Sequence, residues 1–215
     1  MKKQIIEQAE TFVQSELAED ATGHDWFHVD RVRRNALHIY ELEKSGDPFI
    51  IEMAALLHDI PDEKLNETVE KGEAKLDGFL RTIELSKEEI QKIKKIIASI
   101  SFKGGRKIEL ETVEAKIVQD ADRLDAIGAI GIARVFAYGG KKGQLIYDPF
   151  YHIRGEMTIE EYRKGKSTSI HHFYEKLLKL KDLLNTETAK KMAVSRHQMM
   201  ETFLEQFYQE WNGQS

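Results

Sequence analysis

The sequence predicts an all-α protein, and three observations support this fold class. Only 14 glycines and 3 prolines occur among the 215 residues, a share below the roughly 12% of average proteins. Valine is scarce as well; turns use glycine and proline heavily, and strands use valine. Apolar residues recur at three- and four-residue spacing, and alternating strand patterns of any length are missing.

The helical periodicity is clearest in three segments. Near the start, Ile5, Ala9, Val13 and Leu17 follow one another at four-residue steps. Isoleucines mark one face of 86–101, and a broad apolar stripe marks 187–212. Two capping boxes, Ser86 with Glu89 and Thr158 with Glu161, indicate helix starts. We therefore expect about ten helices, near 2–19, 25–44, 48–59, 67–83, 86–101, 111–124, 126–138, 158–164, 169–184 and 187–212.

One segment departs from this pattern. Residues 139–168 are rich in glycine and lysine and only weakly periodic. A connection of this length inside a compact domain is commonly a functional lid or a disordered segment, although charge runs are equally often plain solvated surface. With no repeats and no low-complexity linker, the sequence predicts a single domain over 1–215, a helical bundle with a flexible flap at 139–168.

Composition excludes several classes of function. The chain has no cysteine, which excludes disulfide scaffolds, iron–sulfur clusters, thiolate zinc sites and cysteine nucleophiles. A net charge of −5 argues against a nucleic-acid polymer or an anionic membrane as partner. The N-terminus does not have the form of a signal peptide, and no apolar run approaches the roughly 18 residues of a membrane helix. We expect a soluble, cytoplasmic protein, as a monomer or homodimer.

Two polar clusters interrupt buried stretches. His58 and Asp59 end an apolar run that Pro61 stops, so both side chains need partners at the edge of the core. Asp120, Asp122 and Asp125 lie between two apolar segments, where clustered carboxylates are unfavourable unless a cation neutralises them. Two imidazoles and two carboxylates from different helices would suit Mn²⁺, Fe²⁺, Zn²⁺ or Mg²⁺.

Four sequence blocks carry a resemblance that covers nearly the whole chain. They are GHDWFHVDRV, ALLHDIPD, VQDADRLDAIGAIGIAR and HHFYEKLLKL, in this order. The set resembles the HD-domain metal-dependent phosphohydrolases. The residues within the blocks are similar to those of the YpgQ/YedJ-like bacterial branch of that superfamily.

The resemblance implies a metal site. Its ligands would be His28, His58, Asp59 and Asp122, the last being the aspartate of the Ala-Asp-x-Leu element. Asp120 and Asp125 are the alternatives to Asp122 as the fourth ligand. The expected cofactor is a divalent metal ion, Mn²⁺ first, with Mg²⁺, Fe²⁺, Zn²⁺, Ni²⁺ and Co²⁺ as alternatives.

The resemblance also implies catalytic residues. An acidic residue three positions after the paired aspartate assists the attacking water in such enzymes, and Asp62 occupies that position here. Lys64 is the second expected catalytic residue, as a positive partner for the transferred group. Further substrate contacts are expected at His24, Arg31, Lys103, Arg106, His172 and Lys176; the last two share an i, i+4 row.

These assignments predict an enzyme whose partner is a small-molecule nucleotide. A divalent cation lowers the pKa of water, and the resulting hydroxide attacks phosphorus in line. Within this chemistry the resemblance favours a (deoxy)nucleoside triphosphate pyrophosphohydrolase that releases a monophosphate and pyrophosphate. The alternatives are a 5′-nucleotidase, another phosphomonoesterase or phosphodiesterase of the superfamily, and a non-catalytic, metal-dependent nucleotide sensor.

Overall fold

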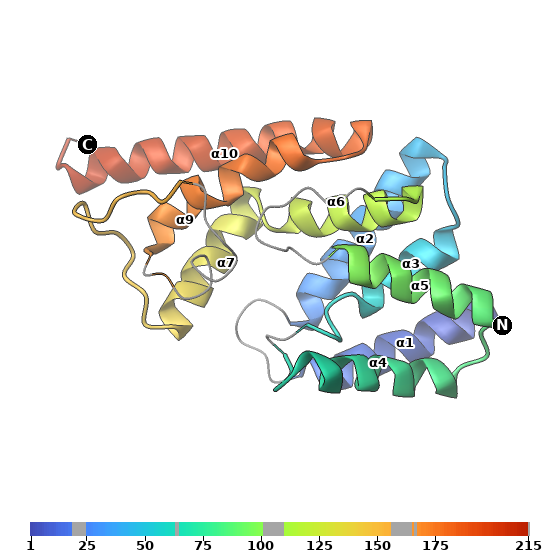
Figure 1. Ribbon diagram of the computed structural model, residues 1–215. Helices are drawn as coiled ribbons and strands as arrows, with labels where there is room; N and C mark the ends of the chain where they lie inside the picture. The colour runs from blue at the N-terminus through green and yellow to red at the C-terminus, as the bar shows by residue number, and fades with distance from the viewer. Residues whose placement is uncertain (19–24, 63–64, 101–109, 156–164, 166, 215) are drawn as a thin grey trace. The chain divides into compact units, whose positions relative to one another are not determined.

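A computed structural model (Figure 1) describes residues 1–18, 25–62, 65–100, 110–155, 165 and 167–214. In these ranges the regular structure is helical, without any strand, so the all-α prediction is confirmed. The described residues form two compact units, one up to Asp122 and one from Arg123 onward. The single domain expected over 1–215 stays a prediction. None of the helices in the described ranges is both long enough and apolar enough to cross a membrane.

The first unit is built around α3 (Pro48–Leu57), which is buried at eight positions. It packs against α1 (Lys2–Glu16), α2 (Trp26–Glu43) and α5 (Lys87–Ile100). Helix α4 (Val69–Thr82) lies beside α1 (Figure 1), where the rings of Phe12 and Phe79 stack at 4.3 Å. Most of α6 (Val113–Asp125) completes the unit.

Local sequence signals fix where these helices begin. Asp25 and Asp47 accept backbone N–H groups at the starts of α2 and α3, and Thr68 does so at the start of α4. The capping box predicted at Ser86 forms. The Glu89 N–H donates to the Ser86 hydroxyl, and the Ser86 N–H and hydroxyl both donate to the Glu89 carboxylate. Each cap satisfies an amide that the helix itself leaves without a partner.

The second unit contains α7 (Gly128–Lys141), α9 (Ser169–Glu175), the 3₁₀ helix η1 (Leu177–Leu183) and α10 (Glu187–Trp211). Helix α10 packs along α7 and η1. Its Phe203 ring lies 5.8 Å from Phe136 of α7 and 5.7 Å from Phe173 of α9, measured between centroids. These three rings join α7, α9 and α10, which follow α6 in sequence.

Two expectations for this unit need adjustment. The single helix expected at 169–184 is divided, because Lys176 adopts φ −135° and ψ −59° and the chain continues as a 3₁₀ helix. The first residues of the expected flap are helical, since α7 extends to Lys141. The helix expected at 158–164, with its capping box at Thr158, lies outside the described residues.

The described part of the flap is tied to α9. The backbone N–H groups of Ser169 and Ile170 donate to the carbonyls of Leu145 and Ile146, each at 3.0 Å. Arg154 forms a two-pronged ion pair with Glu175, with nitrogen–oxygen distances of 2.8 and 2.7 Å. These contacts hold residues 145–154 by both main-chain and side-chain bonds.

Candidate metal centre

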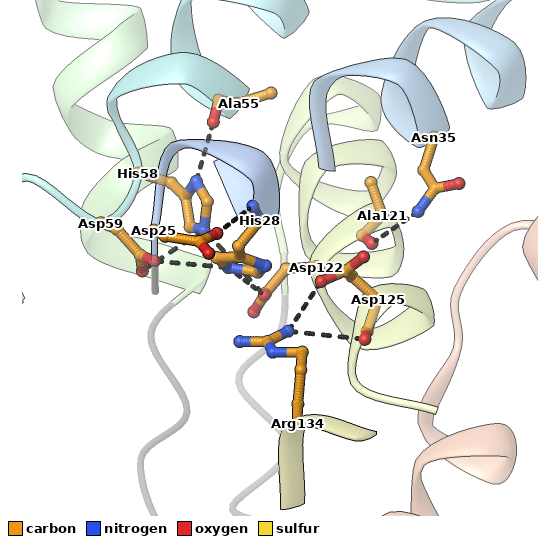
Figure 2. A network of polar contacts seen from close by, with 10 residues as sticks. All are labelled: Asp25, His28, Asn35, Ala55, His58, Asp59, Ala121, Asp122, Asp125 and Arg134. Carbon is orange, nitrogen blue, oxygen red and sulfur yellow. Dashed lines mark hydrogen bonds and ion pairs between the residues drawn. The ribbon is translucent and has the colours of Figure 1, made fainter. Parts of the chain in front are cut away.

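Three helices of the first unit supply four polar side chains to one place (Figure 2). His28 lies in the first turn of α2, His58 and Asp59 follow the last turn of α3, and Asp122 lies in the last turn of α6. Asp25 fixes the start of α2, because its carboxylate accepts the backbone N–H of His28 at 2.8 Å. The four residues that the resemblance implied as ligands thus lie together.

The distances within the cluster are short. His28 Nε2 lies 3.3 Å from Asp59 Oδ2 and 3.6 Å from Asp122 Oδ1. His58 Nε2 lies 3.3 Å from Asp59 Oδ1 and 3.9 Å from Asp122 Oδ1. One ligand atom from each of His28, His58 and Asp59 fits within 4.8 Å of the other two.

A backbone contact sets the tautomer of His58. Its Nδ1 lies 2.7 Å from the carbonyl oxygen of Ala55, so Nδ1 carries the proton and donates it there. In the neutral ring this leaves a lone pair on Nε2, the atom that faces the carboxylates. Among the described residues this buried Nε2 has no hydrogen-bond partner. Metal-binding histidines are held in this way, with the other ring nitrogen on a carbonyl or carboxylate.

The cluster fits a divalent cation. Imidazole nitrogens and carboxylate oxygens, which are the usual ligand atoms of divalent metals, lie 3.3–3.9 Å from one another. His28, His58 and Asp59 are buried, at 1%, 8% and 7% exposure. The Asp122 side chain is 37% exposed, which leaves one side of the cluster accessible to solvent. A set of two imidazoles and two carboxylates suits first-row divalent metals.

The competing aspartates have other surroundings. The Asp125 carboxylate binds Arg134, with Oδ2 2.7 Å from Nη1 (Figure 2). Asp120 is fully buried, and it lies two residues before Asp122, a spacing that places it on another face of the helix. These contacts favour Asp122 as the fourth ligand.

Other predicted site residues lie in both units. Asp62 is half-buried in the turn after Asp59, and its N–H donates to the Asp59 carbonyl at 2.9 Å. Arg31 is half-buried on α2, one turn after His28. His172 and Lys176 belong to the second unit, where the N–H of Lys176 donates to the His172 carbonyl at 3.0 Å at the end of α9.

Four predicted residues lie outside the described ranges. They are His24, Lys64, Lys103 and Arg106. Their assignments stay predictions.

The sequence did not reveal two residues that support the site. Asn66 donates to the carbonyls of Ile60 and Asp62, at 2.8 Å each, in the turn that carries Asp59. Arg134 pairs with Asp125 across the break between α6 and α7. The Asn66 contacts run from a side chain to main-chain carbonyls in a turn outside the helices, and Asp125 and Arg134 are nine residues apart, so apolar periodicity gives no indication of either.

Known proteins share this fold and much of this sequence. The HD domain family matches residues 26–127. YpgQ of Bacillus subtilis (strain 168) is 42% identical over 202 residues, which cover 93% of this chain and 90% of YpgQ. A Bacillus thuringiensis structure described as an HD-superfamily hydrolase is 48% identical, with a TM-score of 0.76 and 99% of each chain covered.

A second solved relative carries a nucleotide. The crystal structure of Bacillus subtilis YpgQ in complex with ADP aligns with a TM-score of 0.77 and 37% identity, covering 98% of this chain and all of that one. Matches of this identity and coverage extend well beyond the histidine–aspartate motif. The chain is therefore a member of the HD superfamily of hydrolases, in the branch that contains YpgQ.

Proposed function

We propose that this protein is a divalent-metal-dependent phosphohydrolase of nucleotides, and that it converts (deoxy)nucleoside triphosphates into monophosphates and pyrophosphate. The observation that carries the proposal is the cluster of His28, His58, Asp59 and Asp122, in which the Nε2 lone pair of His58 faces carboxylate oxygens. Mn²⁺ is the favoured ion.

The cation and the chain have separate parts in this reaction. A divalent cation bound by the cluster lowers the pKa of water and neutralises charge that develops on phosphate oxygens. The contact from His58 to Ala55 orients one imidazole toward that cation. Asp62, in the turn after Asp59, accepts the proton of the attacking water. Positive side chains bind the polyphosphate; we assign this to Arg31, His172 and Lys176, with His24, Lys64, Lys103 and Arg106.

Two facts support a nucleotide as substrate. YpgQ, whose whole length resembles this chain, has been crystallised with ADP. The net charge of −5 favours a small anionic ligand, held by local positive charge, over a nucleic-acid polymer.

The test is a panel of nucleoside mono-, di- and triphosphates incubated with and without Mn²⁺, with phosphate and pyrophosphate measured separately. We expect pyrophosphate from triphosphates, lost in Asp122→Ala. Phosphate from monophosphates would instead identify a 5′-nucleotidase. Tight nucleotide binding with no turnover of any substrate, in protein that carries metal, would identify a sensor.

A second variant separates chemistry from binding. Asp62→Asn keeps the size of the side chain and removes its ability to accept a proton at neutral pH. We expect it to abolish most turnover while nucleotide and Mn²⁺ affinities stay at the wild-type values. Full turnover in Asp62→Asn would remove Asp62 from the mechanism.

A further inference from the structure

The turn from Asp59 to Asp62 follows α3 and carries two carboxylates. Its main-chain hydrogen bonds include Ile60 N–H to the Leu57 carbonyl at 3.1 Å, Asp62 N–H to the Asp59 carbonyl at 2.9 Å and Leu65 N–H to the Asp62 carbonyl at 3.1 Å. Pro61 has no N–H to donate. The positions of both carboxylates depend on how this turn is held, and a side chain that follows the turn gives it further support.

Asn66 supplies that support. Its Nδ2 donates to the carbonyl of Ile60 at 2.8 Å and to the carbonyl of Asp62 at 2.8 Å. An amide nitrogen has two hydrogens, so both are used, one on each side of Pro61. This fork fixes the Ile60 carbonyl, one residue after Asp59, and the Asp62 carbonyl at the same time.

Helix α4 approaches this fork at a glycine. A Cβ atom on Gly72 would lie 2.8 Å from Asn66 Nδ2 and 2.8 Å from the Pro61 carbonyl oxygen, which is closer than real Cβ contacts allow. Gly72 is buried within α4 and adopts no unusual φ. Its lack of a side chain is therefore explained by the space that Asn66 and Pro61 occupy.

We propose that Asn66 is a positioning residue for the turn 58–62: through its two hydrogen bonds it holds Asp59 and Asp62 in place, and Gly72 keeps the space that this contact needs. The part that concerns Asp62 rests on the proposed function. The part that concerns Asp59 rests on the cluster alone, so metal binding tests it without any turnover.

The first experiment compares Asn66→Ala, which removes both donors without adding charge, with wild type. Isothermal titration with Mn²⁺ gives the stoichiometry, which reports the folded fraction, and the Kd, which reports the site. We expect unchanged stoichiometry and a Kd raised roughly 10-fold, within the 10- to 100-fold range for groups that orient metal ligands. A Kd equal to that of wild type would overturn the role toward Asp59.

The second experiment asks whether Asn66 acts through Asp62. With a triphosphate substrate, Asn66→Ala should lower kcat roughly 10- to 100-fold and leave KM unchanged. In an Asp62→Asn background the same change should have no further effect on kcat. An equal loss in both backgrounds would overturn the role toward Asp62. If wild type hydrolyses nothing, the proposed function fails, and the Mn²⁺ titration still decides the role of Asn66.

A matched pair of glycines tests the steric part. Gly72 and Gly78 both lie within α4, but a Cβ on Gly78 would meet nothing within 4 Å. We expect Gly72→Ala to raise the Mn²⁺ Kd as Asn66→Ala does, and Gly78→Ala to behave as wild type. The stoichiometry of each titration again reports the folded fraction, so a raised Kd at unchanged stoichiometry separates an effect on the site from a loss of folding. Wild-type affinity in Gly72→Ala would contradict the proposed packing.

Discussion

Arg134 holds Asp125 by two contacts: its Nη1 lies 2.7 Å from Asp125 Oδ2 and 3.4 Å from the Asp125 carbonyl oxygen. The Asp125 side chain is 2% exposed and that of Arg134 is 18% exposed. Asp125 lies one helical turn after Asp122, and both are carboxylates in the last turns of α6. The ion pair gives Asp125 a structural partner and leaves Asp122 to the metal cluster.

This division of roles predicts different effects for two identical substitutions. Asp122→Asn should abolish Mn²⁺ binding with little effect on folding, because its side chain is 37% exposed. Asp125→Asn should leave the ligand set intact but lower the free energy of unfolding by about 3–5 kcal/mol, the usual cost of removing one partner of a buried ion pair. Chemical denaturation and Mn²⁺ titration of both variants measure these effects.

Arg134→Met provides the control for the ion pair. It replaces the guanidinium with an apolar chain, and in an Asp125→Asn background it should recover part of the lost stability, because no unpaired charge stays buried. If Asp125→Asn instead lost Mn²⁺ at unchanged stability, Asp125 would be the ligand and Asp122 would not.

The fold and the central cluster were predictable for identifiable reasons. Regular apolar spacing predicted the helices, and Asp25, Asp47 and Ser86 each lie at helix starts that the sequence indicates. The four cluster residues were reached through the order of four sequence blocks, since a lone His-Asp pair carries little information. Composition alone had already excluded thiolate chemistry.

The supporting contacts could not be predicted, because they form in turns and at a helix break, where apolar periodicity carries no information. Asn66 reaches back to Ile60 and Asp62 across a turn, and Arg134 reaches Asp125 across a helix break. Likewise, the division of the helix expected at 169–184 depends on one residue, Lys176, that leaves the helical region. Its local sequence contains no glycine or proline to indicate a break.

Metal binding should stabilise the fold through the same cluster. A ligand that binds only the folded state adds RT ln(1 + [L]/Kd), about 2.7 kcal/mol when Mn²⁺ is present at about 100 times its Kd. We expect a corresponding rise in Tm on adding Mn²⁺ and its reversal by a chelator. His58→Gln should fold but show no such rise, since it lacks the imidazole that His58 turns toward the carboxylates. An equal rise in His58→Gln would place the stabilising metal elsewhere.

The ion pair between Arg154 and Glu175 should stabilise the segment 145–154. Burial alone would raise the pKa of Glu175, but hydrogen bonds from Arg154 and Ser167 outweigh it, and the pKa lies below its ordinary value of 4.5. The ionised form is thus favoured in the folded state, and its contribution is lost as pH falls below 4.5.

Limited proteolysis at neutral pH measures the local effect of this pair. Glu175→Gln should speed cleavage within 145–154, because it leaves the guanidinium of Arg154 without its charged partner. Glu187→Gln is the matched control, since that glutamate lies on the exposed surface at the start of α10, 74% exposed, beside Lys190. Equal cleavage in both variants would show that the Arg154 contact does not hold the segment.

His171 should make the free energy of unfolding depend on pH in a second range, below pH 6.5. Its ring is buried, with Nδ1 3.0 Å from Thr168 Oγ1, and packs against Tyr147. Burial lowers the pKa of His171 below its ordinary 6.5, although Glu175 and Asp148 act in the opposite direction. A histidine with a lowered pKa binds its proton more tightly when unfolded, so its contribution is complete above pH 6.5 and is lost as pH falls below that value.

Chemical denaturation between pH 5 and 7 tests this expectation. The free energy of unfolding of wild type should fall with decreasing pH by at most about 1.4 kcal/mol per pH unit, the limit for one proton. His171→Gln should remove that part of the slope, whereas His38→Gln, at an exposed position of α2, should leave the slope as in wild type. A slope that persists in His171→Gln would assign the pH dependence to another group.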